Sequence, residues 1–130
     1  MQMNGTTPHI VQYQGSKRIV APQILQYMPQ KFNRLVEPFA GMAAITIAVA
    51  QKQRTNKFVV NDLNEPLVRL LEAAIMTPNK LIDEYTCVWE GQFTYSDGSV
   101  AHYYKVRDEF NKGDKNPANM LYLLAVTLQP

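Results

Sequence analysis

The stretch from Val36 to Asp62 constrains the fold of this chain more than any other part of the sequence. An apolar run ends in the turn from Pro38 to Gly41, and a helical pattern of small and β-branched residues starts at Ala43. A second apolar run, residues 58–60, leads to Asp62, 21 residues after Gly41. This order of strand, tight turn, helix, strand and acid is typical of a nucleotide-type ligand site at the carboxyl ends of parallel strands.

Two residues of this stretch have properties that suit a ligand site. Gly41 has no side chain, so the backbone there can come close to a bound molecule. Asp62 stands where a carboxylate commonly accepts hydrogen bonds from both hydroxyls of a ribose. An ordinary strand–helix–strand unit with an acid at a strand end has the same pattern, so the residues by themselves leave both interpretations open.

Length and composition predict one globular domain over residues 1–130. The chain is 46% apolar and only 18% charged, which suits a packed core. Its 13 Lys and Arg are nearly balanced by 11 Asp and Glu, so a net charge of +2 does not by itself indicate a nucleic-acid partner. One cysteine, Cys87, rules out an intramolecular disulfide, and together with two distant histidines it makes a zinc site improbable.

The sequence shows no membrane-spanning segment and no signal peptide. No apolar run approaches the ~20 residues that span a bilayer, and the N-terminus lacks the basic-then-apolar layout of a signal peptide. We therefore expect a cytoplasmic protein without a membrane partner.

Outside the central stretch the sequence predicts mainly helices. Ser16 is the expected cap of a first helix whose apolar face carries Ile19, Leu25 and Met28, and which Pro29 ends. The 3.6-residue spacing predicts further helices, with a short hairpin only weakly signalled near Asp97. Their expected buried faces are Leu67, Leu70, Leu71, Ala74 and Ile75; Leu81, Ile82, Tyr85, Val88 and Trp89; Tyr103, Val106 and Phe110; and residues 120–128 all round.

Two strands do not make a covered parallel sheet, which normally has helices on both faces and more strands. The chain also stops at Pro130, directly after its most hydrophobic segment. We therefore expect a piece of something larger. The exposed sheet edge and residues 121–128 would then dock the missing part or drive self-association.

Four blocks of sequence resemble the Dam-type adenine-specific DNA methyltransferase family, in its amino-terminal half. They are YQGSKR at residues 13–18, EPFAGMA at 37–43, NDLN at 61–64 and YYKVRDEFN at 103–111. The resemblance implies an α/β chain with a partial Rossmann-like methyltransferase fold, rich in helices and with an incomplete parallel sheet. The last block has core spacing and is interpreted as structural.

The resemblance also implies S-adenosylmethionine as the ligand and assigns roles in binding it. Asp62 would hold the ribose hydroxyls, Leu63 would touch the adenine, and Phe39 would pack near the cofactor. Lys17 lies in the block that reaches the cofactor's carboxylate, and Glu37 either lines the pocket or caps the following turn. The full expected set is Tyr13, Lys17, Glu37, Pro38, Phe39, Gly41, Ala43, Asp62 and Leu63.

The chain departs from the family pattern in three places. Ala43 replaces a second glycine of the turn, and Gln12 stands where some relatives carry a lysine that approaches DNA. The Asp-Pro-Pro-Tyr type motif of the base pocket has no counterpart, because the sequence contains no Asp-Pro-Pro or Asn-Pro-Pro. We therefore expect cofactor binding but no catalytic residue in this chain, no methyl transfer by it alone, and contact with double-stranded DNA through the complete enzyme.

Two other functions remain open from the sequence. The first is a non-catalytic interaction or regulatory protein that retains this half-fold. The second is part of a dinucleotide-dependent oxidoreductase, which shares the strand–turn–helix–strand–acid pattern. The turn at residues 39–43 has one glycine where a pyrophosphate-binding turn usually has three, which disfavours the oxidoreductase.

Overall fold

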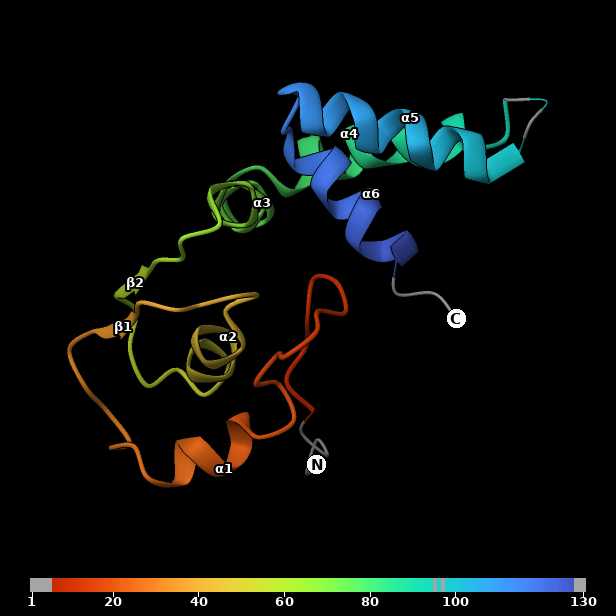
Figure 1. Cartoon of the computed structure of the whole chain (residues 1–130). Helices are drawn as coiled ribbons and strands as arrows, with labels where there is room; N and C mark the ends of the chain where they lie inside the picture. Colours follow the sequence, from red (N-terminus) through yellow and green to blue (C-terminus); the bar gives the residue numbers. More distant parts are fainter. Residues whose placement is uncertain (1–5, 95, 97, 128–130) are drawn as a thin grey trace. The chain divides into compact units, whose positions relative to one another are not determined.

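The computed structural model describes residues 6–94, 96 and 98–127, and the chain divides into two compact units after Leu63. The first unit holds the predicted strand–helix–strand stretch, and the second is built from helices (Figure 1). The expectation that residues 1–130 act as one cofactor-binding domain stays a prediction.

The first unit contains a two-stranded parallel sheet joined by a helix. Strand β1 pairs with β2 in the register Leu35↔Phe58 and Glu37↔Val60. The sequence predicts strands over residues 34–37 and 57–61, and both are present. The first begins one residue later than predicted, and the second is one residue shorter at each end. The elements are α1 (Ala21–Gln26), β1 (Leu35–Glu37), α2 (Ala44–Gln51) and β2 (Phe58–Val60).

Helices α1 and α2 pack together to form the core of the first unit, with partly buried residues of both strands against them. Small residues of α2 allow this close packing: Ala48 and Val49 are buried together with Ala21 and Leu25 of α1. On the other face of the sheet, the paired residues Val36 and Val59 are 52% and 44% exposed. The sheet therefore has one covered face within this unit.

The expected start of the first helix at Ser16 is wrong. The Ser16 hydroxyl accepts a hydrogen bond from the backbone N–H of Arg18 within a series of turns, and α1 begins only at Ala21. Pro22 explains the late start, because proline is tolerated in the first turn of a helix and breaks its interior. Ile19 consequently lies outside the helix and is 81% exposed, whereas Leu25 is buried as expected.

Arg54 holds the carboxyl end of α1 in place. Its side chain is buried, and Nη1 donates to the carbonyl oxygens of Leu25 at 2.5 Å, Met28 at 3.1 Å and Pro29 at 3.4 Å. The last carbonyls of a helix have no partners within the helix itself. A cationic donor there satisfies them and also suits the negative end of the helix dipole.

Replacing Arg54 by methionine is expected to lower the free energy of unfolding of the first unit by about 2 kcal/mol, because charged hydrogen bonds to buried carbonyls are lost. Hydrogen exchange of the α1 and α2 amides measures this change. Lys52→Met, which alters an exposed side chain two residues earlier, is the control and should leave exchange unchanged. Equal exchange rates in the two variants would contradict the capping role.

The second unit is a cluster of four helices in which α6 packs against the other three (Figure 1). Its largest fully buried side chains are Tyr122, Leu67 and Leu70. Burial raises the pKa of the Tyr122 phenol above its ordinary value of 10.0. The helices are α3 (Glu65–Met76), α4 (Pro78–Gly91), α5 (Gly98–Lys112) and α6 (Pro117–Thr127).

Local capping sets the start of α3. The sequence offers Asn64 or Glu65 as the cap and Pro66 for the first turn, and the structure has Asn64 as the cap. The Asn64 side chain accepts a hydrogen bond from the backbone N–H of Leu67, and proline occupies the first turn. The buried faces of α3 and α4 are both smaller than their apolar spacing suggests. Ile75 of α3 is 65% exposed, and Ile82 of α4 is 59% exposed. The weakly signalled hairpin is wrong: α5 starts at Gly98, and Asp97 itself lies outside the described residues.

The fold class agrees with expectation. The chain is α/β and rich in helices, and its two parallel strands with a connecting helix form part of a Rossmann-like methyltransferase fold. Within the part of the chain that the structure describes, no helix combines the length and apolar character needed to cross a membrane.

Candidate functional site

The carboxyl ends of β1 and β2 are joined by backbone hydrogen bonds that bring two loops together. The backbone N–H of Asn61 donates to the Glu37 carbonyl at 2.9 Å, and the N–H of Ala40 donates to the Asn61 carbonyl at 3.0 Å. The turn after β1 and the acidic loop after β2 therefore lie side by side. This is the juxtaposition that the order of elements predicts.

A side-chain hydrogen bond fixes the acid of one loop to the glycine of the other. Asp62 Oδ2 accepts from the backbone N–H of Gly41 at 2.9 Å. Gly41 has a φ of +52°, a conformation that residues with a side chain rarely adopt. The half-buried Asp62 carboxylate is thus held in a defined position beside the turn.

Tyr13 also lies beside this turn. A Cβ atom added to Gly41 would lie 3.5 Å from Tyr13 Cε1, so the ring is in van der Waals contact with the glycine position.

Ala43, two residues after Gly41, is buried and also has a left-handed backbone conformation, with φ +53°. Glycine would adopt this conformation without steric cost, whereas alanine costs roughly 1 kcal/mol or more there. The left-handed backbone gives a physical reason for the glycine expected at this position.

Glu37 caps helix α2 from the end of the preceding strand. Its Oε2 accepts from the Thr46 backbone N–H at 2.9 Å and from the Thr46 hydroxyl at 2.6 Å. The N-cap residue of α2, Ala43, has no side chain that accepts a hydrogen bond, so a distant carboxylate takes this role. Its charge also suits the positive end of the helix. Of the two roles considered for Glu37, the capping role has direct support from these bonds.

Replacing Glu37 by alanine is expected to lower the free energy of unfolding of the first unit by about 1 kcal/mol, the usual loss when a helix cap is removed. Hydrogen exchange of the α2 amides measures the loss. Thr46→Val removes one of the two bonds and should have a smaller effect, and the double variant should lose little more than Glu37→Ala alone. Additive effects would show that the two residues do not act together.

Four of the expected site residues have exposed side chains and make few contacts. Phe39 is 91% exposed and Leu63 is 100% exposed, one on each of the two joined loops. Pro38 is also exposed. Lys17 is exposed, and its Nζ donates to the Gly15 carbonyl at 3.1 Å. The site thus has a fixed centre at Asp62 and Gly41, with apolar side chains that project from its two loops.

Thr46 is a residue of this region that the sequence analysis missed. The signal was present, because a helix that starts at an alanine needs a capping acceptor from elsewhere, and an acid stands at the end of the preceding strand. The choice of Thr46 as the donor depends on how the helix returns to the strand, which local pattern does not contain.

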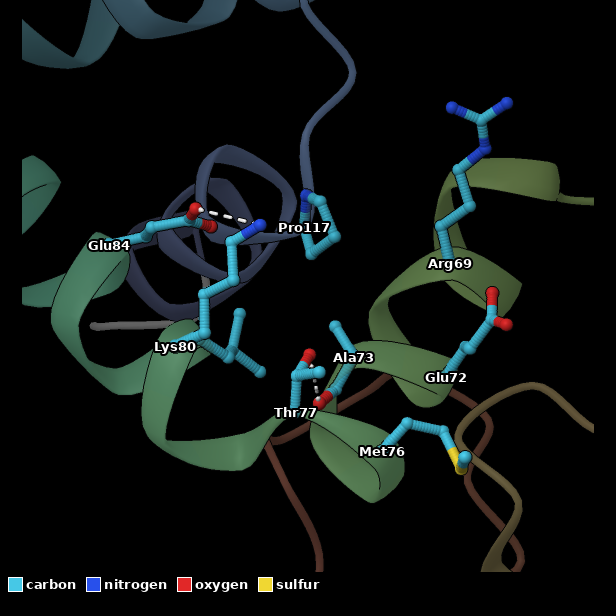
Figure 2. Close-up of a pocket in the computed structure, with 9 residues that line it drawn as sticks. Arg69, Glu72, Ala73, Met76, Thr77, Lys80, Glu84 and Pro117 are labelled. Carbon is cyan, nitrogen blue, oxygen red and sulfur yellow. Dashed lines mark hydrogen bonds and ion pairs between the residues drawn. The ribbon is translucent and has the colours of Figure 1, made fainter.

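The second unit has a cavity of about 570 Å³, and none of the expected site residues lines it. It is lined by α3 and α4 with Pro117 at its edge, and Figure 2 shows Lys80 joined to Glu84 across one turn of α4. That pair is 3.7 Å apart and exposed, and Arg69 pairs with Glu65 on α3. Three of the four charged side chains in the lining, Arg69, Lys80 and Glu84, are therefore paired along their own helices, as is usual for a solvated surface.

Comparison with known proteins identifies the family. Residues 13–128 match the family described as D12 class N6 adenine-specific DNA methyltransferase. The chain is 27% identical over 108 residues to the type II methyltransferase M.MjaIII of Methanocaldococcus jannaschii, covering 78% of this chain and 37% of that protein. It is 35% identical over 72 residues to the type II methyltransferase M1.LlaDCHI of Lactococcus lactis subsp. cremoris, covering 55% of this chain and 24% of that protein.

The aligned parts amount to well under half of the length of either relative. No solved structure matches the chain significantly. The family match includes all four sequence blocks that carry the resemblance and extends over most of the chain. This protein therefore belongs to the D12 class of N6 adenine-specific DNA methyltransferases.

Proposed function

We propose that this chain binds S-adenosylmethionine at the carboxyl ends of β1 and β2, as the cofactor-binding part of a DNA adenine methyltransferase. The observation that carries the proposal is the hydrogen bond from the Gly41 backbone N–H to Asp62. It fixes a carboxylate beside a turn whose backbone has no side chain to obstruct a ligand. Membership of a methyltransferase family implies a methyl donor.

The residues around this bond fit the chemistry of the cofactor. Asp62 is a suitable acceptor for two ribose hydroxyls, and Leu63 beside it offers an apolar surface for adenine. Tyr13 lies against the glycine turn, where an aromatic face suits a sulfonium cation. Lys17 supplies the positive charge for the cofactor's carboxylate. Phe39 and Leu63 are exposed, and ligand pockets are lined predominantly by apolar and aromatic side chains of this kind.

The role of this chain is to bind and orient. When bound, S-adenosylmethionine supplies an electrophilic methyl group on its sulfonium. Asp62 and the Gly41 turn would fix the ribose, and Pro38 and Ala43 would keep the turn in shape. Glu37 supports the site through its hold on α2, and Oε1 of that carboxylate makes no hydrogen bond with the described residues. Such positioning is the main contribution that a methyl transfer requires.

We further propose that the complete enzyme methylates the exocyclic amino group of adenine in double-stranded DNA. The family description supports this substrate. The names of both relatives, type II methyltransferases, support a role in restriction-modification. Base chemistry in a duplex requires the target base to leave the stack. The family's motif for that pocket is missing from these 130 residues, so we expect no methyl transfer by this chain alone.

The proposal is tested by calorimetric titration of the chain with S-adenosylmethionine, with NAD as the competing ligand class. We expect binding of S-adenosylmethionine and of its demethylated product, and none of NAD. A methylation assay on duplex DNA with labelled cofactor follows. The chain alone should be inactive, and activity should appear when a separately purified segment of a relative that carries the Asp-Pro-Pro-Tyr type motif is added.

Each outcome has a distinct meaning. Binding of NAD in preference to S-adenosylmethionine would overturn the proposal in favour of an oxidoreductase. Binding of neither ligand would overturn it in favour of an interaction protein. Methyl transfer by the unaided chain would show that catalysis does not need the missing motif.

A further inference from the structure

The segment that leads into the candidate site, residues 6–12, forms neither helix nor strand. Thr7 and Val11 of this segment are nevertheless buried. Tyr13 follows directly, and its ring lies against the Gly41 turn. The place of an aromatic ring in the proposed cofactor site therefore depends on how an irregular segment is held.

One hydrogen bond joins this segment to the rest of the described chain. Nε of Arg18 donates to the Thr7 carbonyl at 2.6 Å. Within the described part of the chain, residues 8–12 make no hydrogen bond of their own. Because the bond comes from a charged donor, it is stronger than a bond between two neutral groups. Arg18 thus closes a loop over residues 7–18, which contains Tyr13 and Lys17.

Arg18 itself extends from a base that the core of the first unit holds in place. It belongs to a turn in which the Lys17 carbonyl accepts from the Val20 N–H at 3.1 Å and from the Ala21 N–H at 2.8 Å. Ala21 is the first residue of α1 and is buried together with residues of α2. The bond to Thr7 therefore ties the incoming segment to a fixed part of the protein.

Tyr13 lies between two constraints. After it, the Ser16 N–H donates to the Tyr13 carbonyl at 3.1 Å, and this turn fixes the chain that continues to α1. Before it, the bond from Arg18 to Thr7 is the constraint on the chain that enters the site. Lys17 depends less on that bond, because its own carbonyl is tied to the start of α1.

An ordinary surface charge does not account for Arg18. Arginine side chains are mostly exposed, and buried ones are usually paired. The Arg18 side chain is half-buried, yet among the described residues no carboxylate lies within ion-pair distance of it. Its acceptor is a backbone carbonyl 11 residues earlier in the chain. The contact thus serves the shape of the loop.

We propose that Arg18 is a positioning residue, which places Tyr13 against the Gly41 turn through its bond to Thr7. The proposal rests on the proposed function, because this placement affects binding only if the Gly41 turn receives S-adenosylmethionine. Without the bond, the loop is open in part of the molecules. The apparent affinity for the cofactor then falls in proportion to the fraction that stays closed.

Calorimetric titration of the full chain with S-adenosylmethionine tests the proposal, with Arg18→Met as the variant. Loss of a hydrogen bond from a charged donor changes an equilibrium by about tenfold at its lower limit, so the affinity should fall by at least about threefold. Arg34→Met is the matched control. It removes an exposed arginine of the same unit and should leave the affinity unchanged.

A double-mutant cycle with Tyr13→Ala shows whether Arg18 acts through Tyr13. If it does, the two substitutions together should weaken binding little more than Tyr13→Ala alone. If the two separate losses multiply instead, the proposal is overturned, because Arg18 then acts on the ligand by another route.

Nuclear Overhauser contacts report the position of the Tyr13 ring without any cofactor. Contacts between its ring protons and the α protons of Gly41 should be present in the wild type and in Arg34→Met, and should weaken or disappear in Arg18→Met. Hydrogen exchange of the α2 amides should be the same in all three proteins. Retained ring contacts in Arg18→Met, or faster exchange throughout α2, would overturn the proposal, since Arg18 would then not hold the ring or would act through the fold.

Failure of this proposal is distinguishable from failure of the proposed function. If the wild type does not bind S-adenosylmethionine, the proposed function fails, and the ring contacts still decide whether Arg18 positions Tyr13. If the wild type binds the cofactor and the affinity of Arg18→Met is within about threefold of it, the role of Arg18 alone is rejected.

Discussion

Asp62→Ala is expected to weaken S-adenosylmethionine binding by at least about a hundredfold. A hydrogen bond to a charged acceptor contributes about 1.5–3 kcal/mol, and two ribose hydroxyls lose such an acceptor together. Because about 1.4 kcal/mol corresponds to a tenfold change, losing both bonds reaches a hundredfold at the lower limit. The Gly41 N–H also loses its acceptor, so the turn itself becomes less well defined. Calorimetric titration measures the change.

Two further variants separate the role of Asp62 from its charge and from general effects. Asp62→Asn keeps an acceptor for the Gly41 N–H but removes the charge, so binding should fall by an intermediate amount. Asp83→Ala makes the same charge change on exposed α4 and should leave binding unchanged. An affinity of Asp62→Ala within about threefold of the wild type would remove Asp62 from the site, because the loss of one charged bond alone exceeds that factor.

The position of the candidate site could be predicted from sequence because it depends on topology more than on detail. Parallel strands have their carboxyl ends at the same edge, so the turn after β1 and the acid after β2 had to meet once both strands were identified. The hydrogen bond that joins Gly41 to Asp62 was not predictable at the same level. Its existence depends on a positive φ at Gly41, which the sequence permits but does not impose.

Helix boundaries were harder to predict where two local signals competed. Ser16 is a good N-cap by residue type, yet Pro22 determines that α1 starts only at Ala21. In α3, Asn64 and the proline after it agree, and the predicted start is confirmed. Apolar spacing identified which face of α3 is buried but not how many of its residues are covered. The number covered depends on how far the neighbouring helices extend along α3, which is a property of tertiary packing. Ile75 is exposed for this reason, although it has helical spacing from Leu71.

Net charge averaged over the whole chain conceals how its charges are distributed. Residues 1–63 contain seven Lys and Arg against two acids and residues 64–130 contain six against nine, and only the structure defines that division. Arg54 shows a second limit of sequence patterns. An arginine between two polar residues suggests an exposed position, whereas it is buried because the carboxyl end of α1 offers it three carbonyl oxygens.

Gly91→Ala is expected to lower the free energy of unfolding of the second unit by about 2–3 kcal/mol, within the range for overpacking a well-packed interior. A Cβ at this last residue of α4 would lie 2.5 Å from His102 Cε1. The ring cannot easily move, because it is buried, donates from Nε2 to the Val88 carbonyl at 2.7 Å and packs edge-on against Tyr122. Fluorescence of Trp89, the single tryptophan, reports unfolding of this unit in urea.

The sign of the effect makes this substitution informative. In an exposed helix, alanine is more favourable than glycine by about 0.8–1.0 kcal/mol, so local propensity alone predicts stabilisation. A matched test is the same substitution in a His102→Ala background, where the clash is absent and the propensity term should reappear as a gain in stability. If Gly91→Ala is stabilising in both backgrounds, the close packing of α4 against His102 is wrong. If it is destabilising in both, the cause lies in the backbone at Gly91 and not in the histidine ring.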